Sequence, residues 1–206
     1  MWPTDEIGAT QTQDKALLAR AKQTVFGLNN YQAKPWANTN GFCLSWPPAV
    51  RLSGKEDSVT LVTSFATAIS STTADNGCVV NKGGMLENIG ATVAINDLLL
   101  QSHGGRMRFF PAWNGTALGA ASFTTLRAYG AFLVTASIDN HDVVSPVSLV
   151  SEVGGDVVFE SPWLDTTADP VVKDGKGSAV SVTSVSAGVY SFATDVGGTY
   201  TLSSGK

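Results

Sequence analysis

The sequence predicts an α+β protein in which a helical half, residues 1–104, precedes an antiparallel β half, residues 105–206. Two observations predict this division. Between residues 13 and 104 apolar residues recur at three- and four-residue steps, the period of an amphipathic helix. After Gly105 the apolar runs shorten to strand length, and Thr, Ser, Val and Gly dominate the sequence.

Two helices are predicted in the first part of the helical half. Residues 14–28 carry one apolar stripe, formed by Leu18, Ala21, Val25 and Leu28. The second helix is expected to begin at Pro47-Pro48, because proline is tolerated in the first turn of a helix, where its missing N–H has no partner to lose. We expect this helix to end near Gly54.

The next two predicted helices differ in the width of their apolar surface. In the third, the apolar face consists of Val59, Val62, Ala66 and Ile69. The fourth, residues 87–103, is apolar almost all round, and Gly104-Gly105 is expected to end it. Because such a helix is usually buried on several sides, we expect more helical partners than these four and predict that an N-terminal region is missing from the chain.

The second half predicts an antiparallel β-sandwich of short strands bounded by glycine. Residues 139–142, Asp-Asn-His-Asp, are typical of a turn and predict a hairpin between the strands on either side. Residues 165–176 combine Asp, Pro, Lys and Gly and are expected to form a loop or linker. The predicted strands lie at residues 107–110, 123–126, 131–138, 143–150, 157–159, 179–185, 189–193 and 199–202.

Composition and charge exclude several classes of partner. The net charge of −4, with no basic cluster, argues against nucleic acid, whose binding requires many Lys and Arg residues. No apolar run is long enough to cross a bilayer, so no membrane partner is expected. The N-terminus lacks the features of a signal peptide. The compartment stays open, and a secretory or extracellular location is possible for a longer parent chain.

Searches for catalytic motifs leave one candidate. No nucleophile elbow, phosphate-binding loop or dinucleotide fingerprint is present, and the two histidines lack neighbours at metal-ligand spacing, so neither a metal nor a cofactor is predicted. Glu87 and Asn88, however, follow a glycine-rich loop and open the most apolar helix. A carboxyl group held in a partly dry pocket suits glycosidic hydrolysis. The alternative is an ordinary acid and cap at a helix N-terminus.

The aromatic residues offer a second set of candidates. Flat apolar ring faces suit pyranose rings, and they are available at Trp36, Phe42, Trp46 and Trp113. We predict substrate contacts for Trp36, Trp46 and His103. Core packing is the alternative for each tryptophan, and capping of the fourth helix is the alternative for His103.

Several blocks, in the same order, resemble glycoside hydrolase family 95. The family's Leu-Leu-Gln-Ser-His is matched at residues 99–103, its Leu-Pro-Ala-Leu-Pro segment by Phe-Phe-Pro-Ala-Trp at 109–113, and its Gly-Leu-Arg-Ala-Arg-Gly-Gly-Phe by residues 125–132. Upstream, residues 41–46 and the Val-Arg-Leu of 50–52 resemble Gly-Trp-Ser-x-Ala-Trp and Ala-Arg-Leu of that family. The resemblance covers residues 1–153.

This resemblance implies the C-terminal helices of an (α/α)6 barrel in residues 1–104 and a C-terminal β domain in residues 105–206. It further implies inverting hydrolysis of α-L-fucosides or related α-linked sugars, with an oligosaccharide or glycan as substrate. In the family a glutamic acid protonates the leaving oxygen, and an asparagine polarised by an aspartate positions the attacking water. The family's glutamic acid and asparagine come from segments upstream of this chain, so the chain alone is predicted to be inactive.

The match departs from the family at the loop that carries the aspartate. Aligning Asn88 with the asparagine of the family's Asp-Gly-Asn places Leu86 at the aspartate position, with Glu87 one residue later. The longer glutamate side chain is predicted to reach the same point. Two other hypotheses stay open: a non-catalytic module whose β half binds glycans or a protein surface, and a barrel relative that serves as a scaffold.

Overall fold

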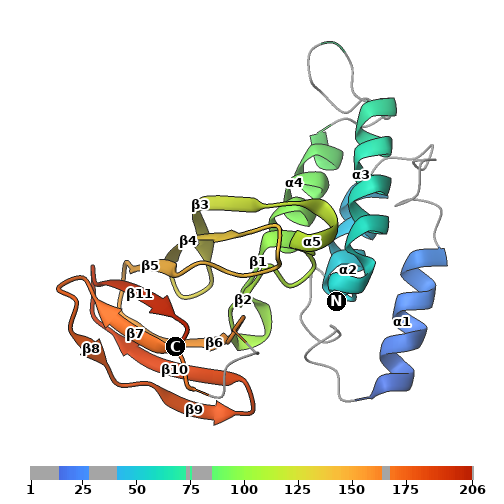
Figure 1. Ribbon diagram of the computed structural model, residues 1–206. Helices are drawn as coiled ribbons and strands as arrows, with labels where there is room; N and C mark the ends of the chain where they lie inside the picture. Colours follow the sequence, from blue (N-terminus) through green and yellow to red (C-terminus); the bar gives the residue numbers. More distant parts are fainter. Residues whose placement is uncertain (1–13, 28–40, 73–74, 76–84, 164–167, 206) are drawn as a thin grey trace. The chain divides into compact units, whose positions relative to one another are not determined.

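The computed structural model describes residues 14–27, 41–72, 75, 85–163 and 168–205 (Figure 1). It contains α-helices followed by antiparallel sheets, which confirms the predicted α+β class. Two compact units are formed, a helical unit of Met1–Leu98 with Ala112–Asn114 and a β-rich unit of Leu99–Pro111 with Gly115–Lys206. The division thus falls at residues 98 and 99, whereas the sequence placed it at 104 and 105. That the helices belong to a barrel stays a prediction.

Helix α1 of the helical unit follows the sequence pattern closely. It spans Lys15–Gly27, and the Asp14 carboxylate before it accepts hydrogen bonds from the backbone N–H groups of Ala16 and Leu17, at 2.9 and 3.0 Å. This is the geometry of an N-cap, which satisfies donors that the first turn leaves unpaired. Val25 of the predicted stripe is buried.

Helix α2, Gly41–Arg51, begins earlier than predicted. Pro47 and Pro48 lie inside it instead of at its start. In this position each proline removes one backbone hydrogen bond to the carbonyl four residues earlier. The same stretch carries Trp46, Ala49 and Val50, which are fully buried. Burial of this apolar surface offsets the free energy lost with the missing hydrogen bonds. The preference of proline for the first turn of a helix, which predicted a start at Pro47, does not take this burial into account.

Helix α3, Ser58–Thr72, follows the short 3₁₀ helix η1, Lys55–Asp57, and confirms the predicted third helix. Leu61, Phe65 and Ala68 are buried at helical spacing, while Val59 of the apolar face noted in the sequence is 47% exposed. The sequence contains two apolar stripes, and packing against α2 selects the one that carries Phe65.

Helix α4, Met85–Leu99, is shorter than predicted and is not buried on several sides. Ala91, Ala94 and Leu98 are buried, but Ile89 is 51% and Ile95 is 43% exposed. The chain leaves the helix after Leu99, where strand β1, Leu100–Gln101, pairs antiparallel with β2, Arg108–Phe109. Helical periodicity continues to His103 in the sequence, so the strand partner decides where the helix ends.

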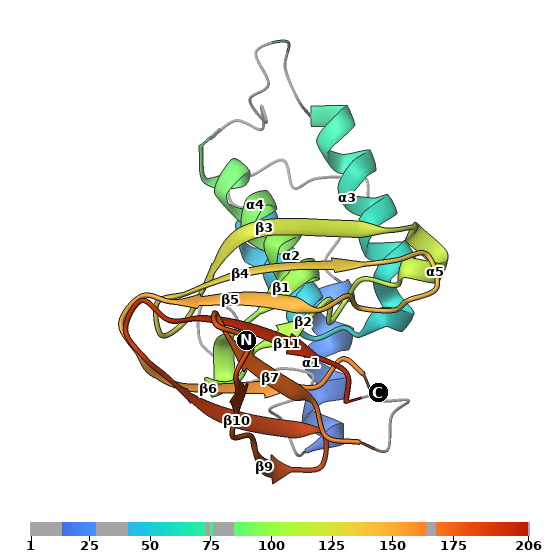
Figure 2. The same ribbon diagram turned by 60° about the vertical axis from the view of Figure 1, so that its left-hand side comes forward.

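The β-rich unit contains two larger antiparallel sheets (Figure 2). One has six strands in the order β3-β4-β5-β11-β7-β8, and the other has three in the order β6-β10-β9. A short helix, α5, spans Gly115–Leu118 before the first of these strands. The strands are β3 Ala121–Ala128, β4 Phe132–Ile138, β5 Val147–Ser151, β6 Gly155–Glu160, β7 Val171–Asp174, β8 Ala179–Val180, β9 Thr183–Ser186, β10 Val189–Thr194 and β11 Thr199–Ser203.

The two sheets share an aromatic core. Phe192 of β10 and Tyr200 of β11 come from different sheets, and their ring centroids lie 5.4 Å apart. Phe159 of β6 contacts Phe192 edge to face, with centroids 6.1 Å apart, and is fully buried. Rings in such tilted arrangements add to the free energy that burial of their area contributes. This core confirms the predicted antiparallel, sandwich-like arrangement.

The predicted hairpin is present between β4 and β5, which pair antiparallel from Phe132↔Ser151 to Thr135↔Ser148. Asp139 organises the turn: its Oδ1 accepts hydrogen bonds from the backbone N–H groups of His141 and Val143, at 2.8 and 2.9 Å. These bonds to the charged form lower the pKa of the Asp139 carboxyl below its ordinary value.

The predicted loop at residues 165–176 contains a strand. Of that stretch, residues 168–176 are described, and Val171–Asp174 form β7 between β11 and β8. Val172 is 1% exposed and pairs with Leu202 and Val180 on its two sides. The surrounding Asp, Pro, Lys and Gly residues predicted a loop or linker. A short strand forms there because buried Val172 pairs with β11 on one side and β8 on the other.

The predicted strand at residues 179–185 is two strands. β8 belongs to the six-stranded sheet and β9 to the three-stranded sheet. The chain therefore passes from one sheet to the other within one apolar stretch, as strands do at the corners of two-sheet proteins. Sequence alternation does not reveal such a change of sheet.

Candidate functional site

The predicted catalytic residues Glu87 and Asn88 belong to the first turn of α4, which begins at Met85. Their backbone is helical, but their side chains lie outside the described part of the structure. Carboxylates are stabilised at this end of a helix because backbone N–H groups there lack helical partners. The position thus suits both an active-site acid and a helix-end acid, and the catalytic assignment stays a prediction.

Trp46, a predicted substrate contact, lies in the interior of the helical unit. It is fully buried on α2, and its ring stacks on Phe65 of α3, with centroids 4.2 Å apart and planes 25° apart. This packing corresponds to the core alternative for Trp46. Trp36 lies outside the described residues, and the substrate contacts of both tryptophans stay predictions.

His103 lies in the β-rich unit, in the 3₁₀ turn η2, His103–Gly105. It is 3% exposed and lies beyond the end of α4 at Leu99, with β1 between the two. The capping interpretation stays a prediction. Gly104 and Gly105 both have positive φ angles, 68° and 74°, which lets the chain reverse from β1 toward β2. A substrate contact by His103 stays a prediction.

A buried ion pair joins two helices of the helical unit. Arg51 Nε, at the end of α2, donates to Asp97 Oδ2 of α4 at 2.6 Å, and both side chains are about nine-tenths buried. Removing one partner of such a pair leaves an uncompensated buried charge. The pair therefore fixes the spacing of α2 and α4.

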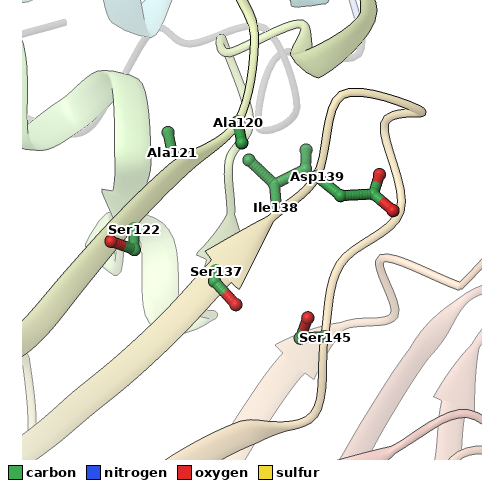
Figure 3. A pocket seen from close by; sticks show the side chains of 7 residues that line it. All are labelled: Ala120, Ala121, Ser122, Ser137, Ile138, Asp139 and Ser145. Atoms are coloured by element: carbon green, nitrogen blue, oxygen red, sulfur yellow. The ribbon is translucent and has the colours of Figure 1, made fainter.

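A shallow, open depression of about 380 Å³ lies at one end of the β3–β4 pair (Figure 3). Its polar groups are three serine hydroxyls and the Asp139 carboxylate. Figure 3 shows this carboxylate extending toward the following turn, where its Oδ1 accepts two backbone hydrogen bonds. The acid is thus engaged in the turn and is poorly placed for proton transfer. The lining residues are Ala120, Ala121, Ser122, Ser137, Ile138, Asp139 and Ser145.

A second depression of about 230 Å³ lies beside the turn between β3 and β4, and we call it the Tyr129 depression. Tyr129 is 63% exposed, and an arginine and an aspartate line the same hollow. It thus combines an exposed aromatic residue, a cation, an anion and a hydroxyl, all from the β-rich unit. The lining residues are Ser102, Gly105, Arg106, Met107, Tyr129, Gly130, Phe132, Asp156 and Val158.

Two arginines share one carboxylate next to this depression. Arg106 Nη1 lies 3.0 Å and Arg108 Nε 3.3 Å from the same atom, Glu160 Oε1. Arg108 is buried, and its guanidinium nitrogens have no hydrogen-bond partner among the described residues, so its contact with Glu160 is an ion pair of poor angular geometry. Burial lowers the pKa of Arg108, and the neighbouring Glu160 partly offsets this effect.

Among the residues that the structure describes, no group of three or more His, Cys, Asp or Glu side chains is placed to hold a metal ion. Within the same part of the chain, no helix is long and apolar enough to cross a membrane.

The sequence predictions did not include the Tyr129 depression. Arg106, Tyr129 and Asp156 come from three separate segments. The hydrogen bond from the Tyr129 N–H to Ser102 Oγ and the bridge between Met107 and Phe159 of β6 connect these segments. One signal was present in the sequence: a tyrosine before a glycine, between two predicted strands, where the matched family block has arginine. An aromatic residue in a turn is often a binding residue, because nothing in a turn requires its burial.

Solved structures that are similar to this chain include a glycoside hydrolase. No protein-family model matches the chain, and no curated protein matches it. The solved structure is a GH127 β-L-arabinofuranosidase from Geobacillus stearothermophilus T6, with 11% sequence identity and a TM-score of 0.32. The match covers 79% of this chain and 30% of that protein, so the chain spans under a third of its length. It is a glycoside hydrolase of a different family from the predicted family 95.

Proposed function

We propose that the chain is the C-terminal part of a glycoside hydrolase that acts on α-L-fucosides or related α-linked sugars with inversion, and that it is inactive by itself. The proposal rests on the ordered sequence blocks that resemble family 95. What supports it further is the Arg51–Asp97 pair, because it connects a residue of the upstream Val-Arg-Leu block with the helix that Glu87 and Asn88 open.

In the proposed mechanism Glu87 assists water attack and does not protonate the leaving group. The family's aspartate polarises an asparagine that holds the attacking water, and Glu87 takes the aspartate's place from one residue later. An inverting enzyme needs a second carboxyl group on the opposite side of the scissile bond. That acid is proposed to lie in the N-terminal barrel region of a longer parent chain.

The test compares the chain with the complete open reading frame to which it belongs. Both proteins are assayed for release of nitrophenol from a panel of nitrophenyl α-glycosides that includes the α-L-fucoside. We expect release only by the longer protein. Release by the 206-residue chain alone would contradict the proposed need for an upstream acid, and absence of release from every α-glycoside by the longer protein would overturn the glycosidase proposal.

A substitution in the longer protein tests the role of Glu87. We expect Glu87→Gln to reduce kcat by about 100-fold or more, the range that general acid–base groups contribute, while the protein stays folded. Glu56→Gln is the matched control, because Glu56 is an exposed acid before another helix and only pairs with Lys22 at 3.8 Å. Equal activity of the two variants would assign Glu87 to the helix end alone.

The scaffold and the non-catalytic binding module remain the alternative functions. A longer protein that folds but hydrolyses no glycoside would favour one of them. The Tyr129 depression in the β-rich unit favours glycan binding.

A further inference from the structure

The Tyr129 depression has the size of a site for a single sugar ring. Its volume of about 230 Å³ is below the range of roughly 300–1,000 Å³ that is typical for pockets of drug-sized ligands. All of its lining residues belong to the β-rich unit, so it is complete within that unit.

The turn that carries Tyr129 is held in place by its neighbours. The backbone N–H of Tyr129 donates to Ser102 Oγ at 3.0 Å, and the carbonyl of Ala131 accepts a bond from the N–H of Glu152 at 3.1 Å. Gly130 has a φ of +87° and packs on Phe132 so closely that an added Cβ would lie 2.5 Å from that ring. The tyrosine is therefore presented on a fixed backbone, which reduces the conformational entropy lost when a ligand binds.

The exposure of Tyr129 is unusual for an aromatic side chain. By contrast, Phe159, Phe192 and Tyr200 of the same unit are buried in its aromatic core. An exposed ring offers an apolar face to the C–H groups of a sugar and a hydroxyl to its polar edge.

The charged groups of the depression complement a neutral, hydroxyl-rich ligand. Arg106 supplies N–H donors, and the exposed carboxylate of Asp156 supplies acceptors. Because the Arg106 guanidinium already pairs with Glu160 at 3.0 Å and Asp156 adds a second negative charge, the site has little net attraction for an anion. Hydroxyl groups can donate to the carboxylate and accept from the guanidinium, so a sugar ring uses both.

We propose that the Tyr129 depression is a non-catalytic site that binds one pyranose ring of a neutral glycan. Tyr129 contacts the apolar face of the ring, while Arg106 and Asp156 contact its hydroxyls. The site lies outside the predicted catalytic residues and requires no part of the chemistry proposed for Glu87.

The experiment is an NMR titration of the 206-residue chain with methyl α-L-fucopyranoside, with methyl α-D-glucopyranoside and, as an acidic sugar, with glucuronate. We expect saturable shifts at millimolar concentration of a neutral sugar, centred on the amides of Ser102, Tyr129, Gly130 and Asp156. Shifts that are absent, do not saturate or occur elsewhere would overturn the proposal. Stronger binding of glucuronate than of both neutral glycosides would overturn the assignment to neutral sugars.

Variants separate binding by the ring from a change in folding. Tyr129→Ala should weaken binding by about tenfold, whereas Tyr129→Phe, which keeps the ring face, should change it by less than about threefold. Val153→Ala is the matched control, because Val153 is also 63% exposed in the same unit and does not line the depression. Unchanged amide shifts outside the turn verify folding of each variant. Equal binding by Tyr129→Ala and the unsubstituted chain would contradict the proposal.

This experiment is independent of the assay for hydrolysis. Loss of activity in Glu87→Gln with normal sugar binding at Tyr129 supports both proposals. If the parent protein binds sugar at Tyr129 but hydrolyses no glycoside, the hydrolase proposal is overturned and the proposed binding site is supported.

Discussion

The helical unit and the β-rich unit are held together by different means. The helical unit buries an ion pair, Arg51–Asp97, and leaves large apolar residues of its helices exposed, among them Val59, Ile89 and Ile95. The β-rich unit closes an aromatic core between two sheets; its pair Arg127–Glu152 lies at the surface, and its buried Arg108 shares the part-exposed Glu160 with Arg106. In the helical unit both partners of the pair are about nine-tenths buried, so this unit is sensitive to the loss of either side chain, whereas hydrogen-bonded strands distribute stability over many groups.

Both units also leave single large apolar residues exposed. Ile89 and Ile95 are exposed in the helical unit, and Val153 and Val196 are exposed in the β-rich unit. Singly exposed apolar residues are normal on protein surfaces, so this property does not distinguish the two units.

The strongest test of the comparison breaks the buried pair. We expect Asp97→Ala to destabilise the helical unit by about 3–5 kcal/mol, because Arg51 then keeps a buried charge without its partner. Hydrogen exchange should show loss of protection in α2 and α4 before the six-stranded sheet loses any. The control is Glu152→Ala, which removes one partner of an exposed pair and should cost less than about 1 kcal/mol. Equal loss of protection in both units would show that they unfold as one body.

A second test addresses packing in the β-rich unit. A Cβ added to Gly115 would lie 2.2 Å from the carbonyl oxygen of Asp139, so Gly115→Ala must displace the turn between β4 and β5. We expect a loss of about 1–3 kcal/mol, measured by chemical denaturation. Gly27→Ala makes the same change in the helical unit at a position with no atom within 4 Å, and it should leave stability unchanged or raise it. If Gly115→Ala leaves the free energy of unfolding unchanged, the turn between β4 and β5 can move without an energetic cost.

The smallest expected effect is the pH dependence of the Asp139 turn. Backbone hydrogen bonds from Val143 and His141 lower the pKa of this exposed carboxyl from its ordinary value of 3.8. A lowered pKa in the folded state means that the carboxylate stabilises the turn above the ordinary value, and that this stabilisation is lost as the pH falls through the folded value. The protection factor of the Val143 amide, which corrects the exchange rate for its intrinsic pH dependence, should therefore fall on acidification. In Asp139→Asn, whose amide oxygen accepts without titrating, this fall should disappear.

Sequence periodicity identified the helices and strands better than it identified their ends and faces. α1 and the β4–β5 hairpin were predicted because Asp14, the apolar stripe and the Asp139 turn act over a few residues. The buried face of α3, the start of α2 and the end of α4 were not, because each depends on a partner distant in the sequence. Phe65 packs on Trp46, and Leu100 pairs with Phe109.

The candidate site residues also divide into those that the local sequence indicated and those that only the fold brings together. Glu87 and Asn88 were selected from local composition and from a family resemblance, and they lie in the first turn of α4, which begins at Met85. The Tyr129 depression is lined by residues from separate segments, among them Tyr129, Arg106 and Asp156. Their spacing in the sequence does not predict that they lie close together.

By itself the sequence determined the α+β class, the order of helical and β halves, and the local turns, because hydrophobic period and side-chain capping act between near neighbours. Only the tertiary structure decided which apolar stripe is buried, that Arg51 meets Asp97, and that an exposed tyrosine adjoins an arginine and an aspartate. Those outcomes depend on contacts between residues far apart in the chain, whose free energies no short segment contains.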